Sequence, residues 1–294
     1  MGRGKSQSSL QLIEAAYSIL TEIQPASVRA VCYRLFTAGV IDSMNKSCTN
    51  RVSTQLVWAR EQGVIPWEWI VDESREAERP ATWADPAEFA AAMKRSFRRD
   101  AWHHQHTRIE VWSEKGTVRG TVAPVLEEYG VTFQVFHGYG SATVVCGAAL
   151  DSVRDDKPLK VFYVGDYDPS GLHMSAVDLP VRLERYGASL ELIRLALTKQ
   201  DITHKAGLPS FPLASKTADP RWRWYRKTTK LDRCWELDAL SPAVLRERLK
   251  AAIVAEIEPE AWERTRFAEA AEQASLATCL DAWHSLSTAP PEGA

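Results

Sequence analysis

The apolar positions of residues 9–62 recur three or four residues apart, which is the period of one buried helix face. The first such face consists of Leu10, Ile13, Ala16, Tyr17 and Leu20. Ser27 follows Pro25 and is placed to cap a second helix over residues 28–37. A third helical pattern covers residues 49–62, and residues 64–70 have the pattern of an extended hairpin arm.

Three helices and a β wing make up the winged form of the helix-turn-helix, a fold that binds DNA through its third helix. On the third predicted helix the outward positions carry side chains suited to a DNA groove: Asn50, Arg51, Thr54 and Gln55. We therefore predict that these residues contact DNA. The alternative is a plain helical subdomain whose polar face only meets solvent.

Residues 107–200 alternate between strand and helix patterns. The predicted strands cover residues 108–112, 131–136, 159–164 and 190–197. The predicted helices between and after them cover residues 118–129, 142–153 and 172–186. This order predicts an α/β fold of Rossmann-like type, with a mainly parallel sheet and helices on both faces.

Three carboxylates follow strands of this predicted sheet. Glu114 comes after the first strand, and Asp166 and Asp168 come after the third. The carboxyl ends of parallel strands meet at one edge of a sheet, where ligands bind in such folds. A carboxylate cluster without Cys or His suits Mg²⁺, so these residues are predicted metal ligands. The alternative is that both aspartates are ordinary turn residues.

The net charge of -2 over 294 residues hides a local excess of positive charge. Residues 199–233 hold nine Lys and Arg residues against three acidic ones. Within this stretch Arg221, Arg223 and Lys227 alternate with aromatic residues, which predicts contact with nucleic acid. The alternative is a solvated loop whose tryptophans pack on the core.

The composition also gives an expectation for the cellular location of the protein. No apolar run reaches the roughly 18 residues of a membrane span, and no long apolar segment follows the basic N-terminus. Five cysteines without a CxxC motif indicate neither a disulfide framework nor a zinc knuckle. We expect a cytoplasmic, nucleoid-associated protein without a membrane partner.

The patterns divide the chain into four predicted parts. Residues 1–80 form the winged-helix domain, and residues 81–106 form a linker helix. Residues 107–235 form the metal-binding sheet domain. Residues 236–294 form a C-terminal helical extension and tail.

The carboxylate pattern resembles the Toprim domain, in which a Glu follows the first strand and a DxD motif follows a later one. Glu114, the run Asp166-Tyr167-Asp168 and the glycine-rich residues 137–141 between them carry this resemblance. The helix with Arg29 and Tyr33 is similar to the R-x-x-x-Y helix of the topoisomerase VI A subunit and its meiotic double-strand-break relatives. In that family a winged-helix domain with a nucleophilic tyrosine precedes a Toprim domain.

The chain departs from the family pattern at Cys32, where an aromatic residue is usual, and at Ser170, where the motif often has Tyr. It is also shorter than a typical A subunit, so it resembles a compact bacterial or mobile-element version. The resemblance implies a type IIB topoisomerase-like enzyme that cleaves double-stranded DNA in the presence of Mg²⁺. Tyr33 would form a 5′-phosphotyrosyl link, with Arg29 and Glu114 as further catalytic residues.

The family also implies partners. Cutting both strands implies a homodimer in which each site takes Tyr33 from one protomer and the metal from the other. The sequence has no ATP-binding motif, so strand passage driven by ATP would need a second polypeptide, a GHKL-type ATPase B subunit.

The residues themselves leave other interpretations open. A phenol has a pKa near 10 and is a weak nucleophile at neutral pH, but Arg29 lies on the same helical face and would favour the phenolate. Tyr33 would otherwise be a core residue. Two rival functions are a metal-dependent Toprim nuclease that uses water and a DNA-binding module without catalytic activity.

Overall fold

The structure is a computed structural model that describes residues 5–71, 80–136, 139, 142–154, 157–203 and 207–287. The contacts divide the chain into two compact units, each made of two separate segments. The first unit combines residues 1–74 with residues 108–255, and the second combines residues 75–107 with residues 256–294.

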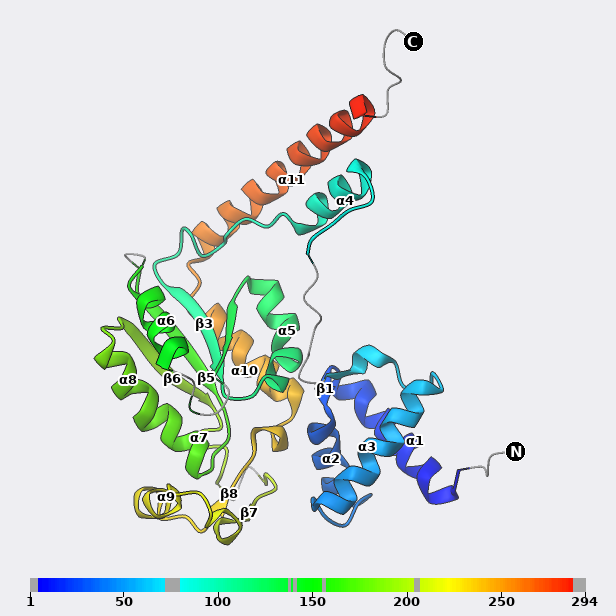
Figure 1. The fold of residues 1–294 in the computed structure, drawn as a ribbon, viewed down its shortest axis with the longest axis vertical. Helices are drawn as coiled ribbons and strands as arrows, with labels where there is room; N and C mark the ends of the chain where they lie inside the picture. Colours follow the sequence, from blue (N-terminus) through cyan, green and yellow to red (C-terminus); the bar gives the residue numbers. More distant parts are fainter. Residues whose placement is uncertain are drawn as a thin grey trace. The chain divides into compact units, whose positions relative to one another are not determined.

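Three helices at the start of the first unit pack around one apolar core (Figure 1). They are α1 (Gln7–Ile23), α2 (Val28–Thr37) and α3 (Lys46–Glu61). Each begins after a residue whose side chain accepts a backbone hydrogen bond from the first turn, namely Ser6, Ser27 and Asn45. The three helices predicted from apolar periodicity are therefore confirmed, together with the Ser27 cap.

The predicted hairpin arm over residues 64–70 is wrong. In the described part of this region, Trp67–Trp69 form a 3₁₀ turn (η1) after Pro66. The short strand β2 (Ile70–Val71) then pairs in parallel with β1 (Ala26–Ser27). Ile65 and Ile70 are both buried in the helical core, so burial of these two side chains bends the segment against the bundle.

The first unit also contains a parallel sheet of four strands, in the order β4-β3-β5-β6. Its strands are β3 (Arg108–Ser113), β4 (Thr132–Val135), β5 (Leu159–Val164) and β6 (Leu190–Ala196). The register places Ser113 beside Val164, so the two central strands end together. The predicted parallel sheet and each of its strands are confirmed.

Helices cover both faces of this sheet, as predicted (Figure 1). The helices are α5 (Thr117–Tyr129), α6 (Ala142–Ser152), α8 (Leu179–Arg185) and α10 (Pro242–Val254). α6 and α8 bury one face against Trp112, Val161 and Tyr163. The alternate strand residues Val111 and Phe162 are also buried, as expected for a sheet that is covered on both sides.

The predicted helix over residues 172–186 begins earlier than expected and is interrupted. α7 (Pro169–His173) starts directly after Asp168, which is its N-cap. A π-helical segment (η2, Met174–Asp178) then leads into α8. The residues of the aspartate turn, 165–171, therefore join the end of β5 to the start of a helix.

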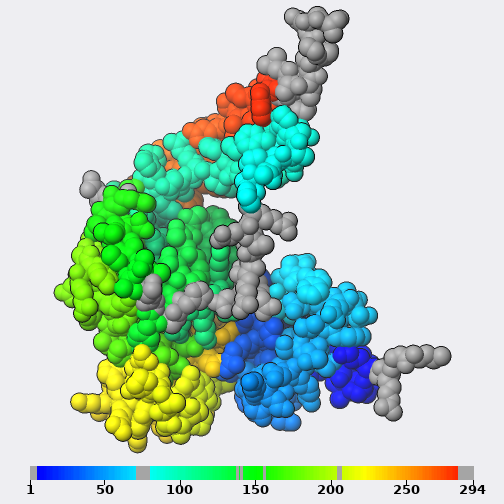
Figure 2. Space-filling view, in the orientation of Figure 1, coloured from blue at the N-terminus to red at the C-terminus, as the bar shows by residue number. Residues whose placement is uncertain are grey.

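The chain after β6 forms small elements beside the aspartate turn. They are β7 (Phe211–Pro212), η3 (Leu213–Lys216), α9 (Trp222–Thr229), β8 (Arg233–Cys234) and η4 (Leu237–Ala239). Tyr167 pairs with Trp235 through two backbone hydrogen bonds of 2.8 and 3.0 Å. In the space-filling view the segment 211–234 forms a continuous yellow region of the first unit (Figure 2).

The helical bundle is bound to the sheet region by hydrogen bonds from Arg246 of α10. Its guanidinium donates to the backbone carbonyls of Ile23, Gln24 and Pro25 and to that of Thr121 in α5. A guanidinium presents several donors in a fixed fork, so one side chain can hold carbonyls from separate segments. This contact fixes the chain at the start of α2, the helix that carries Tyr33.

The second unit pairs α4 (Pro86–Ser96) and the residues after it with α11 (Pro259–Ser287). Trp102 packs edge-on against Trp262 at 5.6 Å between ring centroids. Arg99 forms an ion pair of 2.5 Å with Glu272, and Lys94 pairs with Asp281. Among the described residues, no helix has the length and apolar character needed to cross a membrane.

Candidate functional site

Tyr33 lies on the buried side of α2 and contacts a carboxylate from a distant part of the chain. Its hydroxyl donates a hydrogen bond of 3.3 Å to Oε2 of Glu236. The same oxygen accepts a hydrogen bond from Nε of Arg29, one helical turn before Tyr33. The Arg29 guanidinium also lies 5.8 Å from the centroid of the Tyr33 ring. The predicted Arg29–Tyr33 pair is therefore present, and Glu236 is its third member.

Burial raises the pKa of Tyr33, and the negative charge of Glu236 raises it further. Arg29 acts in the opposite direction and lowers the pKa, but the burial of the phenol outweighs it. The Tyr33 hydroxyl is therefore protonated at neutral pH. Glu236 accepts the hydrogen bond of this hydroxyl, a position from which a carboxylate can also take a proton.

Tyr33 and Arg29 also line a groove of about 480 Å³. Its other side is formed by the segment 209–216, which includes Lys216. The tyrosine side chain is only 4% exposed, so the groove is the part of the surface from which it can be approached.

The three predicted carboxylates come together at the carboxyl end of the sheet. Oε1 of Glu114 accepts a hydrogen bond of 3.4 Å from the backbone amide of Asp166. Burial raises the pKa of Glu114 to about 7, and the charges of Asp166 and Asp168 contribute to this shift. The structure therefore places Glu114, Asp166 and Asp168 close enough to repel one another electrostatically.

Two lysines neutralise the aspartates. Nζ of Lys115 lies 2.8 Å from Oδ1 of Asp166, and Nζ of Lys216 lies 2.9 Å from Oδ2 of Asp168. Asp168 also caps α7, since its Oδ1 accepts a 2.8 Å hydrogen bond from the amide of Gly171. Asp168 thus fills the role of a turn residue, the alternative recognised in the sequence, and belongs to the carboxylate cluster as well.

The donor set suits a hard divalent cation such as Mg²⁺, because it consists of crowded carboxylate oxygens. A buried polar atom without a hydrogen-bond partner among the described residues, the hydroxyl of Tyr163, belongs to the same neighbourhood, since Glu114 contributes to raising its pKa. The described residues contain no group of three or more His, Cys, Asp or Glu already arranged to hold a metal ion. Lys115 and Lys216 form ion pairs with the two aspartates, and the guanidinium of Arg194 lies at the same turn.

Three consecutive residues connect the tyrosine with the carboxylates. We call Glu236-Leu237-Asp238 the bridging segment. Glu236 accepts from Tyr33, and the amide of Leu237 donates a 2.7 Å hydrogen bond to Oδ1 of Asp166. The carboxylate of Asp238 accepts from Ser27 at 2.5 Å and from Lys115 at 3.3 Å. The tyrosine and the carboxylate cluster therefore belong to one continuous polar network within a single chain.

Arg194 of β6 fixes the backbone of the aspartate turn. Its guanidinium donates to the carbonyls of Gly165, Asp166 and Gly171, and its Nε donates to the carbonyl of Leu197 at 2.7 Å. These bonds tie three carbonyl groups of the turn to one side chain, in addition to the backbone hydrogen bond that the carbonyl of Gly165 accepts from Leu197. Arg194 is consequently a positioning residue for the carboxylates.

The four residues predicted to contact DNA on the third helix lie on its outer side. Asn50, Arg51 and Thr54 are exposed on α3. Gln55 is half-buried and accepts a hydrogen bond from Lys5. Their exposure allows the predicted contact, which stays a prediction.

The basic run expected as a DNA contact forms helix α9. Arg223 and Lys227 are exposed on this helix. Arg221 is bound to Asp219 at 3.4 Å and stacks over the ring of Tyr139 at 4.0 Å, so its charge is partly committed within the chain. Apart from Tyr139, the glycine-rich residues 137–141 lie outside the described residues.

No protein-family model and no curated protein sequence matches this chain.

The sequence analysis did not predict four polar residues of the site. Glu236, Lys115, Lys216 and Arg194 all bind residues that are distant in the chain. Lys115 adjoins the predicted ligand Glu114, and this position at a strand end was the signal that could have revealed it. The other three lie outside any motif, so their pairing depends on tertiary structure alone.

Proposed function

We propose that this chain cleaves double-stranded DNA by tyrosine transesterification, as a relative of the topoisomerase VI A subunit. The observation that supports this best is the polar network in which Tyr33 is bonded to Glu236 while the adjacent Leu237 is bonded to Asp166. A nucleophile, a proton acceptor and a carboxylate cluster lie on one network, which is the set of groups that phosphodiester transfer requires. In this proposal residues 9–71 act as a winged-helix-like DNA-binding region and the sheet region as a Toprim domain.

In the proposed reaction Glu236 accepts the hydroxyl proton of Tyr33 as the phenol oxygen attacks a DNA phosphorus atom. A bond forms between this oxygen and the phosphorus, and the bond from the phosphorus to the 3′ oxygen breaks. Arg29 holds the phosphate by its charge. Glu114, with a pKa near 7, can carry the proton that the departing 3′ oxygen needs. The product is a 5′-phosphotyrosyl link and a free 3′-hydroxyl, and the reverse steps reseal the strand.

Glu114, Asp166 and Asp168 would hold Mg²⁺ if the aspartates exchange their lysine partners for the cation. The ion would supply charge stabilisation at the phosphate. We further propose that the protein is a homodimer, since two strands must be cut, and that ATP-driven strand passage would require a separate GHKL-type ATPase subunit. The cytoplasm, on the nucleoid, is the proposed location.

The test is cleavage of supercoiled plasmid with Mg²⁺ or Mn²⁺, stopped in SDS and analysed with and without protease. We expect wild-type protein to leave DNA ends that carry covalent protein. The Tyr33→Phe variant should lose these adducts, whereas Tyr17→Phe, an exposed tyrosine of the same bundle, should keep them. Adducts that persist in Tyr33→Phe would refute the nucleophile assignment.

A second candidate function is hydrolysis of DNA by water, as in a Toprim nuclease. The burial and raised pKa of Tyr33 favour it, because a buried neutral phenol is a weak nucleophile. The same gel separates the two functions, since hydrolysis yields free ends in both wild-type and Tyr33→Phe protein. Intact plasmid in every lane would instead favour a non-catalytic DNA-binding module.

A further inference from the structure

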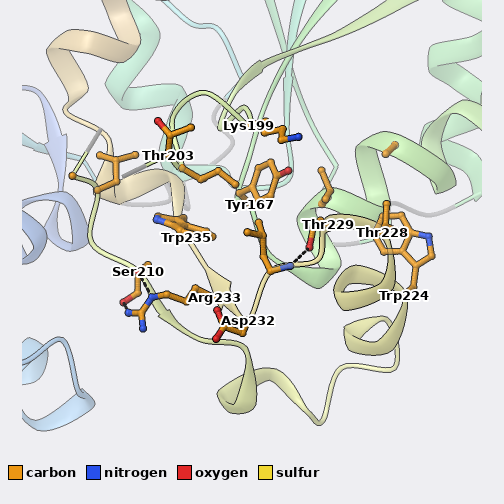
Figure 3. A pocket seen from close by; sticks show the side chains of 16 residues that line it. Tyr167, Lys199, Thr203, Ser210, Trp224, Thr228, Thr229, Asp232, Arg233 and Trp235 are labelled. Atoms are coloured by element: carbon orange, nitrogen blue, oxygen red, sulfur yellow. Dashed lines mark hydrogen bonds between the residues drawn. The ribbon is translucent and has the colours of Figure 1, made fainter. Parts of the chain in front are cut away.

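A cavity of about 890 Å³ lies beside the aspartate turn, and neither proposed chemistry uses it. Tyr167, the residue between the two aspartates, and Trp235, the residue before Glu236, form part of its wall. Figure 3 shows both rings in the middle of the view, with Lys199, Arg233 and Trp224 around them. We call this cavity the aromatic pocket.

The walls of the aromatic pocket are held by the backbone. The paired amides and carbonyls of Tyr167 and Trp235 fix the two residues side by side, and their rings meet edge-on at 6.3 Å and 84°. Each is only 7% exposed. Trp224 of α9 packs edge-on against His173 at 4.9 Å. These aromatic side chains are therefore already ordered in the folded protein, so a ligand that binds them costs little side-chain conformational entropy.

Cations outnumber carboxylates around this aromatic surface, where Asp232 is the acidic residue among the lining residues. The guanidinium of Arg233 is held by Ser210 through hydrogen bonds of 2.6 and 2.8 Å, and Lys199 also lines the pocket. α9 presents Trp224 and Thr228 to the pocket. The exposed positions of the same helix and its C-cap carry Arg223, Arg226, Lys227 and Lys230. One helix thus combines a pocket-lining side with a cationic side.

We propose that the aromatic pocket binds an unstacked base of a DNA strand whose phosphates lie on the cations of α9. A base is a flat aromatic ring with polar edges, so it can pack on Tyr167, Trp224 or Trp235 and bond to the hydroxyl of Thr228 or to Lys199. The volume accommodates a nucleotide, and the surrounding charge matches a phosphate backbone. The ligand class rests on the proposed action on DNA, but the binding itself requires neither Tyr33 nor a metal.

The test measures binding of a fluorescein-labelled oligothymidine of about twelve nucleotides by fluorescence anisotropy. An oligomer of the same length with abasic sugar units carries the same phosphates without bases and serves as the reference ligand. The full-length Tyr33→Phe protein is used in EDTA, so that cleavage does not interfere. We expect it to bind the oligothymidine about tenfold more tightly than the abasic strand.

Two variants distinguish the pocket from the cationic surface. Trp224→Ala should remove most of the preference for the oligothymidine and leave the affinity for the abasic strand unchanged. Thr228→Trp, which fills the pocket with a new side chain, should do the same. Trp222→Ala is the matched control, because Trp222 lies on the same helix but does not line the pocket. Circular dichroism verifies that each variant is folded.

The proposal is overturned if the starting protein binds both strands equally, or binds neither. It is also overturned if Trp224→Ala and Thr228→Trp weaken both strands to the same degree, since the pocket would then act through the fold or through phosphates. None of these results concerns covalent adducts. A failure here leaves the tyrosine proposal intact, and a failure of Tyr33 to form adducts leaves base binding intact.

Discussion

At the scale of single residues, Glu236 is the hydrogen-bond partner of Tyr33. Its oxygen receives hydrogen bonds from both Tyr33 and Arg29, although these residues are separated from it by more than two hundred positions in the chain. Burial raises the pKa of the phenol and the charge of this carboxylate raises it further, so the hydroxyl is protonated at rest. In the proposed reaction the same carboxylate accepts the proton. A single side chain therefore links the resting state with the proposed reaction.

We predict that Glu236→Gln lowers the rate of covalent adduct formation by about 10²- to 10⁴-fold, the usual range for removing a general base. The amide cannot accept the proton, but it can still accept a hydrogen bond from Tyr33. DNA affinity, measured by anisotropy on the same preparation, should change little. An unchanged rate of adduct formation would show that the proton leaves by another route.

The sequence pattern predicts some residues of the candidate site and not others. Glu114, Asp166 and Asp168 could be predicted because each follows a strand, and parallel strands end together at one edge. Glu236 could not, because it follows a short strand, β8, and precedes a 3₁₀ turn. No local spacing relates it to Tyr33. Only the packing of the bundle against the sheet region brings the two together.

At the scale of elements, the aspartate turn leaves no room for a side chain at Gly171. A Cβ atom there would lie 2.7 Å from the carbonyl oxygen of Asp166 and 2.9 Å from Oε1 of Glu114. The helix start of α7 therefore sits directly against the carboxylate cluster. Glycine at this position allows the close approach, although its backbone is an ordinary helical one.

We predict that Gly171→Ala lowers the melting temperature and abolishes DNA cleavage, because the turn and Glu114 must move apart. The matched control is Gly147→Ala in α6, where a Cβ meets nothing within 4 Å. That substitution should raise the free energy of unfolding by about 0.5–1 kcal/mol, the gain expected for alanine in a helix. Thermal unfolding of the two variants tests both statements. Equal stability of the two would contradict the close approach.

A second element-scale contact, between Asp201 and Arg248, predicts a pH dependence. Arg248 of α10 donates hydrogen bonds of 2.6 and 2.8 Å to the two oxygens of Asp201, which follows β6. Burial alone would raise the pKa of Asp201, but the hydrogen bonds from Arg248 and Thr198 outweigh it and lower the pKa. A lowered pKa in the folded state stabilises the fold above the ordinary pKa of aspartate, and this contribution is lost as the pH falls.

We therefore predict that Asp201→Asn reduces the free energy of unfolding by about 1–3 kcal/mol at pH 7. The difference from wild type should shrink as the pH falls below about 4, where the wild-type carboxyl becomes protonated in the unfolded chain and then in the folded one. Urea unfolding of both proteins from neutral to acidic pH measures it. A difference that stays constant with pH would rule out the charged pair as its source.

The elements themselves could be predicted well from the sequence, for a physical reason. Buried strands such as β5 have an almost continuous apolar pattern, and the bundle helices have clear apolar faces and caps. The prediction of a hairpin after α3 is wrong. The apolar residues of that segment include two isoleucines that enter the same core from a bent segment. Local pattern does not distinguish these cases, since burial of Ile65 and Ile70 depends on the surrounding helices.

At the scale of the whole molecule, the tyrosine and the carboxylates are connected within one chain. Tyr33 contacts Glu236, and the adjacent Leu237 contacts Asp166. The family resemblance, by contrast, implies a site shared between two protomers. From these contacts we propose a site in which both groups come from the same protomer.

Mixing two inactive variants tests this arrangement. We predict that Tyr33→Phe and Glu114→Gln, refolded together so that mixed dimers form, produce no covalent adducts, since each protomer lacks one part of its own site. A mixture of either variant with wild type controls for exchange. Recovery of adducts to about one quarter of the wild-type level would show that the site is shared. About half of the dimers in an equal mixture are mixed, and a shared arrangement completes one of the two sites in each of them.

The second unit has a consequence for how the chain reaches its native state. Its first segment, residues 75–107, is synthesised before residues 108–255, and its second segment, residues 256–294, comes after them. A nascent chain that emerges from the ribosome exposes Trp102 and the α4 face before α11 exists to cover them. Helix α11 is made only after residues 108–255, so the apolar surface of the α4 segment stays uncovered, and open to chaperones, while that whole region is synthesised.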